Sequence, residues 1–164
     1  MTDQLRIAVN GAAGRMGQRI AALTIGDPEL QLAAALEYAG SSRLGEDAGE
    51  VCGAGKCGVA ITAELSDRVD AVIDFSVPEA LDSILSVCEE RRIPLVIATT
   101  GYTDEQREKI ASAAQSTPIV MAPSMSLAVN IVMKLVEDAA RALKENADGV
   151  DVEIIERHHR FKED

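Results

Sequence analysis

The chain has 164 residues, which is the length of one domain or slightly more. It is 47% hydrophobic but only 2% aromatic, so its core must consist mainly of alanine, valine, isoleucine and leucine, as suits parallel strands covered by helices. The formal net charge of −11 argues against nucleic acid and anionic membranes as partners.

Three sequence features bear on the compartment and on metal binding. No apolar run is as long as a membrane span, and the N-terminal residues lack the pattern of a signal peptide. The three cysteines are odd in number, and their spacing fits no common zinc site. We therefore expect free thiols, no metal site and a reducing cytoplasm.

Apolar, β-branched runs alternate with amphipathic stretches along most of the chain. The first expected helix runs from Arg15 to about Thr24 with Met16, Ile20 and Leu23 on one face. A last helix is expected over residues 127–144. Strands are expected over residues 6–10, 30–37, 58–62, 70–75, 94–99, 118–123 and 150–156. This alternation predicts an α/β fold with a doubly wound parallel sheet.

Two helix starts carry the spacing of a capping box. Ser76 is followed by Pro78 and Glu79, and Thr103 is followed by Gln106. Residues 40–58 break every periodicity and are expected to form a long loop. The alternation also ends near Pro123. We therefore predict a Rossmann-type dinucleotide-binding domain over residues 1–126 and the start of a second, α+β domain over residues 127–164.

The stretch VNGAAGRMGQRI follows the first expected strand and opens the first helix. Its glycines Gly11, Gly14 and Gly17 are spaced three apart, with Ala13 in the middle. Small residues at this position allow the backbone to approach a pyrophosphate, and the helix N-terminus favours its negative charge. A glycine cluster that permits a tight turn and no more is the alternative.

Glu37 ends the second expected strand, about 20 residues after the last glycine, where an acid binds ribose hydroxyls. The next residue, Tyr38, brings no cation to a 2′-phosphate, and Glu37 would repel one. Arg15 or Arg43 could compensate. The electrostatics therefore favour NADH, or use of both cofactors, over strict NADPH.

The end of the chain is a second chemical cluster. It places Arg157, His158, His159, Arg160 and Lys162 close together in an otherwise acidic protein. A histidine has a pKa near neutrality and can act as a general acid, while clustered cations suit a small polyanionic substrate. A solvated basic tail remains the alternative. Metal binding by the adjacent histidines is disfavoured because neighbouring side chains on a strand diverge.

In chain order, these motifs together resemble the 4-hydroxy-tetrahydrodipicolinate reductase (dihydrodipicolinate reductase) family. The stretches that carry the resemblance are IAVNGAAGRMG, AAALE, SSRLGEDAGEVCGAGKCGV, IDFSVPE, IATTGYT, APSMSLAVN and DVEIIERHHRFKED. The resemblance covers the whole chain, and the pattern Glu-x-His-His-x-x-Lys-x-Asp, which ends at Asp164, is its most specific piece.

The resemblance implies a two-domain, cytoplasmic and usually tetrameric enzyme that reduces a cyclic dicarboxylate with NADH or NADPH. His158 would donate or accept a proton, Lys162 would be a second proton donor, and His159 would bind substrate. The residues implied at the cofactor are Gly11, Ala12, Ala13, Gly14, Arg15 and Met16 at the pyrophosphate, Glu37 at the adenine ribose, Tyr38 where many members have an arginine for the 2′-phosphate, and Ala98, Thr99, Thr100, Ala122, Pro123, Ser124 and Met125 at the nicotinamide half.

The chain departs from the family pattern in three places. Ala98 stands where glycine is common, and Ser124 stands where asparagine is common. The family also continues, beyond the pattern that ends at Asp164, with a substrate-binding Pro-Ser-Gly-Thr segment. We therefore expect this chain alone to bind the cofactor with little or no turnover.

Two other functions stay open. A regulatory dinucleotide-binding module would share the glycine turn and Glu37, but would have no use for the paired histidines. A homoserine or semialdehyde dehydrogenase would share the fold. A semialdehyde enzyme needs a catalytic cysteine at a strand end, however, and Cys88 is expected in the middle of a helix.

Overall fold

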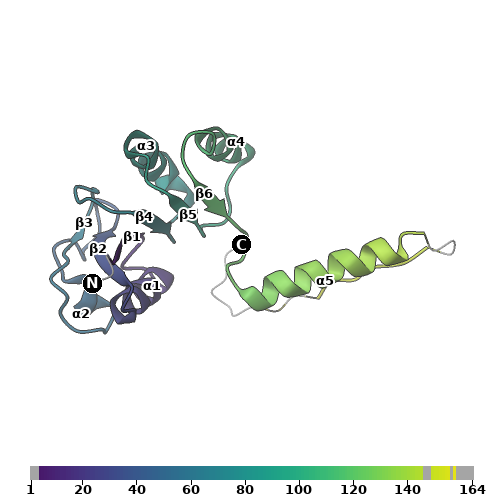
Figure 1. Ribbon diagram of the computed structural model, residues 1–164, viewed down its shortest axis with the longest axis horizontal. Helices are drawn as coiled ribbons and strands as arrows, with labels where there is room; N and C mark the ends of the chain where they lie inside the picture. The colour runs from purple at the N-terminus through teal and green to yellow at the C-terminus, as the bar shows by residue number, and fades with distance from the viewer. Residues whose placement is uncertain (1–3, 146–148, 156, 158–164) are drawn as a thin grey trace. The chain divides into compact units, whose positions relative to one another are not determined.

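The computed structural model describes residues 4–145, 149–155 and 157. The chain divides into two compact units, residues 1–122 and residues 123–164. The first unit is a six-stranded, fully parallel sheet with strand order β3-β2-β1-β4-β5-β6 (Figure 1). Its strands are β1 Leu5–Asn10, β2 Leu30–Leu36, β3 Ile61–Thr62, β4 Ala71–Asp74, β5 Leu95–Ile97 and β6 Ile119–Met121. The predicted doubly wound parallel sheet is confirmed.

Helices cross between these strands. They are α1 Arg15–Gly26, α2 Ala48–Val51, the 3₁₀ turn η1 Pro78–Ala80, α3 Leu81–Arg91 and α4 Asp104–Ala113 in the first unit, and α5 Leu127–Leu143 in the second. The strand order reverses between β1 and β4, because the chain runs outward through β2 and β3 before returning to the other side of β1. In open α/β sheets, ligands bind at this reversal, outside the carboxyl ends of the strands.

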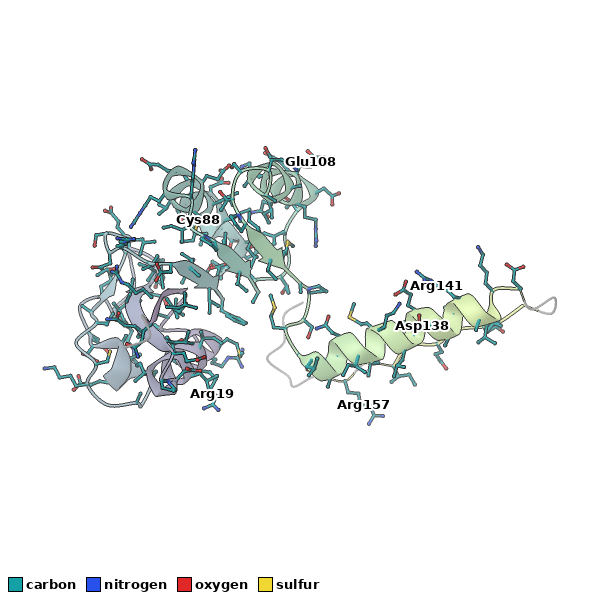
Figure 2. The ribbon with its side chains drawn as sticks, viewed as in Figure 1. Arg19, Cys88, Glu108, Asp138, Arg141 and Arg157 are labelled. Carbon is teal, nitrogen blue, oxygen red and sulfur yellow. The ribbon has the colours of Figure 1, made fainter. Side chains whose placement is uncertain are left out.

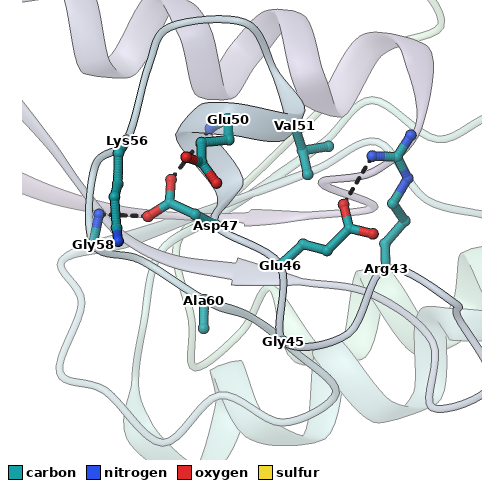
Figure 3. Close-up of a pocket in the computed structure, with 9 residues that line it drawn as sticks. All are labelled: Arg43, Gly45, Glu46, Asp47, Glu50, Val51, Lys56, Gly58 and Ala60. Atoms are coloured by element: carbon teal, nitrogen blue, oxygen red, sulfur yellow. Dashed lines mark hydrogen bonds and ion pairs between the residues drawn. The ribbon is translucent and has the colours of Figure 1, made fainter.

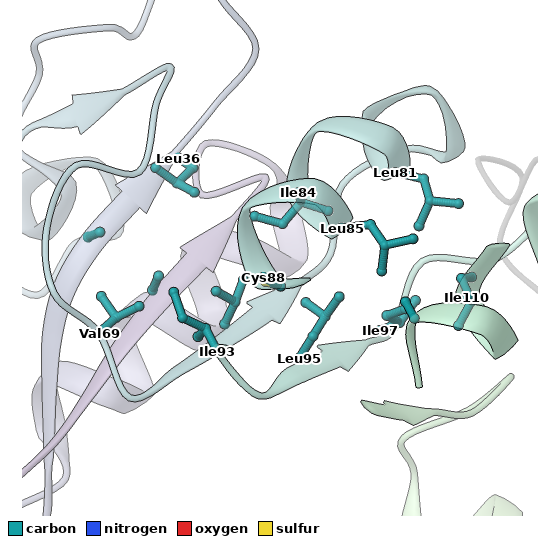
Figure 4. Close-up of a cluster of buried hydrophobic side chains, with 14 of the residues drawn as sticks. Leu36, Val69, Leu81, Ile84, Leu85, Cys88, Ile93, Leu95, Ile97 and Ile110 are labelled. Atoms are coloured by element: carbon teal, nitrogen blue, oxygen red, sulfur yellow. The ribbon is translucent and has the colours of Figure 1, made fainter. Parts of the chain in front are cut away.

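The core lies in two layers because successive strand side chains point to opposite faces of the sheet. On β1, Ile7 and Val9 pack on the side of α1 and α2, whereas Ala8 packs on the side of α3 and α4. Figure 4 shows the second layer, in which α3 and α4 side chains meet aliphatic side chains of the strands. Aliphatic burial of this kind is the main source of stability for such a fold.

The buried face of α1 differs from the prediction. Gly17, Ala21 and Thr24 are the buried residues, whereas Met16 and Leu23 are exposed. The physical reason is the close approach of α1 to the preceding turn, since a Cβ on Gly17 would lie 2.0 Å from the Gly11 carbonyl oxygen. Small side chains therefore make the closest approach, Met16 and Leu23 turn outward, and Ile20 is half-buried against the core.

One of the two predicted capping boxes forms. The Thr103 hydroxyl accepts a hydrogen bond from Gln106 N at 3.2 Å, and the Gln106 side chain accepts one from Thr103 N at 3.0 Å. The box predicted at Ser76 is wrong: η1 follows Val77 without a side-chain cap, and the Ser76 hydroxyl donates to Asp74 at 2.6 Å instead. The Ser76 oxygen, which a cap would use to accept from helix N–H groups, instead accepts from Asn10 Nδ2 at 3.2 Å.

The second unit contains α5. The Ser126 hydroxyl caps it by accepting a hydrogen bond from Val129 N, and ion pairs one turn apart line its polar face. They include Lys134 with Asp138 at 3.1 Å, and Arg141 with Glu137; Figure 2 labels Arg141 and Asp138 on this helix. No helix in the described residues is long and apolar enough to cross a membrane.

The strand predicted over residues 150–156 is wrong for residues 150–155, which have no regular secondary structure, and residue 156 lies outside the described part of the chain. Val152, Ile154 and Ile155 are highly exposed. Strand formation requires hydrogen bonds from a neighbouring strand, and no described strand pairs with this segment. An apolar, β-branched pattern alone does not supply that partner.

Candidate functional site

A cleft of about 560 Å³ lies at the reversal of strand order, where β1 and β4 end. Its lining comes from the segments that follow four neighbouring strands. The lining residues are Asn10, Gly11, Glu37, Tyr38, Ala39, Ala63, Ser76, Val77, Glu79, Ala80 and Ser83. The topology therefore brings the glycine turn and the acid at the end of β2 to one place, as the sequence predicts.

The glycine turn is tightly packed against the next strand. Gly11 has a φ of +75°, which disfavours any L side chain, and a Cβ there would lie 2.6 Å from the Phe75 carbonyl oxygen. Gly14 caps α1 without a side-chain hydrogen bond, and the first turn of α1 holds no acidic residue. The N–H groups of a first helical turn have no partner within the helix. This arrangement suits an anionic group such as a pyrophosphate.

The Glu37 carboxylate joins the end of β2 to the glycine turn. It accepts hydrogen bonds from the backbone N–H of Ala13 at 3.0 Å and from that of Tyr38 at 3.2 Å. The Tyr38 side chain is 69% exposed, and its ring lies so close to Gly40 that a Cβ there would be 2.9 Å from it. Glu37 thus has a fixed position at the cleft, while Tyr38 forms an uncharged, accessible wall.

The charged groups that line this cleft are acidic. Glu37 and Glu79 contribute carboxylates, and no lysine or arginine is among the lining residues. Arg43, one of the two cations that could compensate, is paired with Glu46 at 2.9 Å and lines a different hollow. Arg15 is exposed at the start of α1.

Asp74 is a residue of the site that the sequence reasoning missed. It ends β4, is 1% exposed, and accepts hydrogen bonds from Asn10, Ser76 and Thr99 side chains, at 2.7, 2.6 and 2.8 Å. The sequence does show this residue as an acid that directly follows the apolar residues 71–73. A buried carboxylate is expensive unless several donors satisfy it, so a lone acid at a strand end predicts such a network.

The residues predicted at the nicotinamide half fall into both units. Thr99 is 7% exposed beside Asp74, and Ala98 N donates to the Asp74 carbonyl oxygen at 3.0 Å. Ala122 ends the first unit. The others predicted there are Thr100, which follows β5, and Pro123, Ser124 and Met125, which begin the second unit. Their contacts with a cofactor stay a prediction.

His158, His159 and Lys162, predicted to be the catalytic and substrate-binding residues, lie outside the described residues. Arg157, next to them, is exposed. In the part of the chain that is described, no group of three or more histidine, cysteine, aspartate or glutamate side chains could hold a metal ion.

Cys88 is unsuited to nucleophilic catalysis. It is fully buried in the middle of α3, away from the strand ends. Burial raises the pKa of its thiol to about 12, the negative charge of Asp74 adds to this, and Arg91 opposes it. Because the reactive form of a cysteine is the thiolate, the catalytic thiol of a semialdehyde dehydrogenase is missing at this position.

Residues 40–58 form the predicted long loop, which also contains the short helix α2. The Asp47 carboxylate organises it by accepting hydrogen bonds from the N–H groups of Gly49, Glu50, Cys57 and Gly58, at 2.7 to 3.2 Å. Figure 3 shows the bonds from Glu50 and Gly58. The bond from Cys57 is the main reason that the pKa of Asp47 falls to about 2. Asp47 also lines a hollow of about 640 Å³, together with charged side chains such as Arg43 and Lys56.

Comparisons with known proteins agree with the resemblance. The family model described as "Dihydrodipicolinate reductase, N-terminus" matches residues 5–125, and its C-terminal counterpart matches residues 128–164. The 4-hydroxy-tetrahydrodipicolinate reductase of Rhodopirellula baltica is 50% identical over 99% of this chain, and that of Hahella chejuensis is 43% identical over 97%. The chain spans 60% of the length of each.

Solved structures show the same fold at lower identity. Dihydrodipicolinate reductase from Paenisporosarcina sp. TG-14, solved with dipicolinate bound, has a TM-score of 0.65 at 22% identity. The match covers 84% of this chain and 54% of that one. An aspartate semialdehyde dehydrogenase from Candida albicans, solved with NADP, has a TM-score of 0.57 at 18% identity, over 83% of this chain and 48% of that one. At such identities the fold alone is shared, so the sequence matches decide the family. The chain belongs to the dihydrodipicolinate reductase family.

Proposed function

We propose that this chain forms the cofactor-binding part, and the beginning of the substrate-binding part, of an enzyme that reduces 4-hydroxy-tetrahydrodipicolinate to tetrahydrodipicolinate in lysine and diaminopimelate biosynthesis. The observation that carries the proposal is the family match over both segments, combined with a cleft at the strand reversal that Gly11 and Glu37 line. Relatives that carry the reductase name disfavour a regulatory module without turnover.

The residues of the cleft fit a bound dinucleotide. Gly11 leaves no room for a side chain between the turn and Phe75, so the backbone itself forms that wall. The first turn of α1, at Arg15 and Met16, would hold the pyrophosphate, and Glu37 would accept hydrogen bonds from the ribose hydroxyls. When bound, NADH or NADPH supplies the hydride for the reduction.

We further propose that NADH is preferred. Glu37 and Glu79 place negative charge around the cleft, Tyr38 is uncharged, and Arg43 is held by Glu46. A 2′-phosphate would meet repulsion there, because like charges in a partly enclosed cleft repel with little screening. Calorimetric titration of the chain with NADH and NADPH tests this preference, and a more than tenfold tighter binding of NADPH contradicts it.

A matched pair of variants sharpens the test. Tyr38→Arg adds a cation next to the ribose position and is expected to raise NADPH affinity relative to NADH by about tenfold. Tyr38→Phe keeps the ring without the charge and should leave the ratio unchanged. An unchanged ratio in Tyr38→Arg would show that the 2′-position lies elsewhere.

The acid chemistry is assigned to the end of the chain. His158 would supply a proton to the substrate ring, Lys162 would be a second proton donor, and His159 would bind the cyclic dicarboxylate. In a version extended to the length of its relatives, His158→Gln should lower kcat and leave NADH affinity unchanged, because a general acid acts in the chemical step. A large loss of NADH binding would assign His158 to the cofactor instead.

For the 164-residue chain itself, we propose cofactor binding with little or no turnover, since it spans 60% of its relatives. The assay is steady-state oxidation of NADH at 340 nm with the dicarboxylate, and robust turnover contradicts this. We also propose the cytoplasm as the compartment and a homotetramer as the assembly of the extended protein. Both of these proposals rest on the family resemblance.

A further inference from the structure

The carboxyl ends of the three central strands meet at one buried carboxylate. Asn10 ends β1, Asp74 ends β4 and Thr99 follows β5 by two residues. Oδ1 of Asp74 accepts hydrogen bonds from Asn10 Nδ2 and Ser76 Oγ, and Oδ2 accepts one from Thr99 Oγ1. The two oxygens of the Asp74 side chain therefore bind different segments: Oδ1 binds Asn10 and Ser76, and Oδ2 binds Thr99.

Backbone hydrogen bonds connect the same strand ends. Phe75 N donates to the Asn10 carbonyl oxygen at 3.1 Å, next to Gly11, and Ala98 N donates to the Asp74 carbonyl oxygen at 3.0 Å. Oδ1 thus belongs to the glycine-turn side, which is proposed to hold the pyrophosphate. Oδ2 belongs to the 98–100 segment, which is proposed to contact the nicotinamide half.

A neutral amide replaces this carboxylate only in part. An asparagine has one acceptor oxygen and one donor NH₂ group, so its NH₂ group would face either the Asn10 amide or the Thr99 hydroxyl. Facing Thr99, it keeps a hydrogen bond only if that hydroxyl turns round to accept, and the negative charge that strengthens all three bonds is lost. The network therefore favours an aspartate over a neutral residue of the same size.

We infer that Asp74 is a positioning residue that sets Thr99, and with it the nicotinamide side of the site, relative to the glycine turn. This inference rests on the proposed function, since it assumes that the cleft binds a dinucleotide. Asp74 itself touches no cofactor, and it acts by holding Thr99 and Asn10 in place. Its effect must therefore depend on whether the ligand carries a nicotinamide.

The test compares NADH with ADP-ribose, which lacks the nicotinamide, by calorimetry on the whole 164-residue chain. Asp74→Asn is expected to weaken NADH about tenfold while leaving ADP-ribose within about twofold, because hydrogen bonds to charged groups are worth about this factor. Equal losses for the two ligands, or no loss, would overturn the inference. If the unaltered chain binds neither ligand, the proposed function itself fails.

A double-mutant cycle separates positioning by Asp74 from direct contact by Thr99. If Asp74 acts through Thr99, the double variant with Asp74→Asn and Thr99→Val should bind NADH about as tightly as the single variant that binds it less tightly. Losses that multiply overturn the inference. Thr99→Ser keeps the hydroxyl and should recover most of the NADH affinity that Thr99→Val loses.

Two controls cover stability. Thr117→Val changes another buried threonine, whose hydroxyl makes no hydrogen bond in the described residues, and should alter neither affinity. If circular dichroism shows that Asp74→Asn does not fold, the affinities of Thr99→Val and Thr99→Ser for NADH and ADP-ribose still test the inference. A fall in the ratio of NADH to ADP-ribose affinity in the valine variant, rescued by serine, is the result that the inference requires.

Discussion

Gly17 and Gly26 lie on the same helix, α1, and have opposite surroundings. A Cβ on Gly17 would lie 2.0 Å from the Gly11 carbonyl oxygen and 2.8 Å from Ala12 Cα, whereas a Cβ on Gly26 would meet nothing within 4 Å. Backbone atoms cannot move aside as the end of a side chain can. The glycine turn and the helix are therefore held at a separation that only glycine permits.

Gly17→Ala is accordingly expected to lower the free energy of unfolding by about 3 kcal/mol, because it overpacks a contact between backbones. Gly26→Ala is the matched control and should change it by less than about 1 kcal/mol, in the stabilising direction, since alanine is the better helix former. Urea unfolding followed by circular dichroism measures both. Equal effects of the two variants would show that α1 lies farther from the turn.

Tyr102 is buried beside Thr99 and Asp74, but no partner in the described residues has the distance and angle of a hydrogen bond to its hydroxyl. Tyr102→Phe should therefore be neutral at pH 7 or stabilising by up to about 1 kcal/mol, because an unpaired buried hydroxyl is costly. A loss of stability in the phenylalanine variant at pH 7 would reveal a hydrogen bond to the network.

The raised pKa of Tyr102 also predicts that the protein loses stability in alkali. Burial, and then the charge of Asp74, raise its pKa from 10.0 to about 12. The unfolded chain then releases the phenolic proton first, so stability falls as the pH rises from about 10 to about 12. Tyr102→Phe should flatten this part of the curve, which urea unfolding at several pH values measures.

At the scale of elements, α2 and its flanks depend on Asp47. Hydrogen bonds, first of all from Cys57 N, lower its pKa from 3.8 to about 2. A carboxylate with a depressed pKa stabilises the folded loop above the unfolded value, and this contribution is lost as the pH falls from about 4 towards 2. The order of the loop should therefore be sensitive to acid.

The amide chemical shifts of Cys57 and Gly58 should titrate with a midpoint near pH 2, and not near 4. Asp47→Asn should speed the hydrogen exchange of the same two amides at neutral pH, because an amide side chain offers one acceptor oxygen where the carboxylate offers two. Asp67→Asn, on an exposed turn, serves as the control. A midpoint near 4 in the unaltered chain would mean that these bonds do not form in solution.

At the scale of the whole molecule, the two units differ in how they bury apolar surface. Every residue of the two core clusters lies before residue 120, whereas α5 has no buried residue. Its aliphatic side chains, among them Leu127, Val132 and Leu135, are exposed. The two core clusters of the first unit are thus formed by its own residues.

A chain ending at Ala122 should therefore keep the melting temperature of the first unit within about 2 °C. It should also bind less of the dye ANS, because the exposed apolar face of α5 is gone. Calorimetry and dye fluorescence measure the two quantities. A large fall in melting temperature would show that the second unit contributes to the core of the first.

The elements that the sequence predicted well are those whose signals are local. Alternation of apolar strands with amphipathic helices predicted the parallel sheet, and the spacing of Thr103 and Gln106 predicted their capping box. Capping and periodicity involve residues within a few positions of each other, so these predictions hold where no tertiary contact competes with them. The glycine turn and Glu37 also follow such spacing, which is why their place at one cleft was predictable.

The predictions that were wrong depended mainly on contacts between residues distant in sequence. Ser76 has the spacing of a cap, but its hydroxyl donates to the neighbouring Asp74 and accepts from Asn10, which lies on another strand. Residues 150–155 have the composition of a strand, but no described strand pairs with them. The inward face of α1 was decided by the approach of Gly17 to Gly11, and not by the size of its apolar residues.

Patterns along the chain were thus enough to predict the class of fold, the glycine turn with its acid, and the family that the comparisons support. The arrangement of the elements in space was needed to find that Asp74 joins three strand ends, that Glu79 also lines the cleft, and that Arg43 pairs with Glu46. The reason is physical: local patterns specify which element a residue forms, whereas the pairing of buried donors, acceptors and charges depends on which elements the topology brings together.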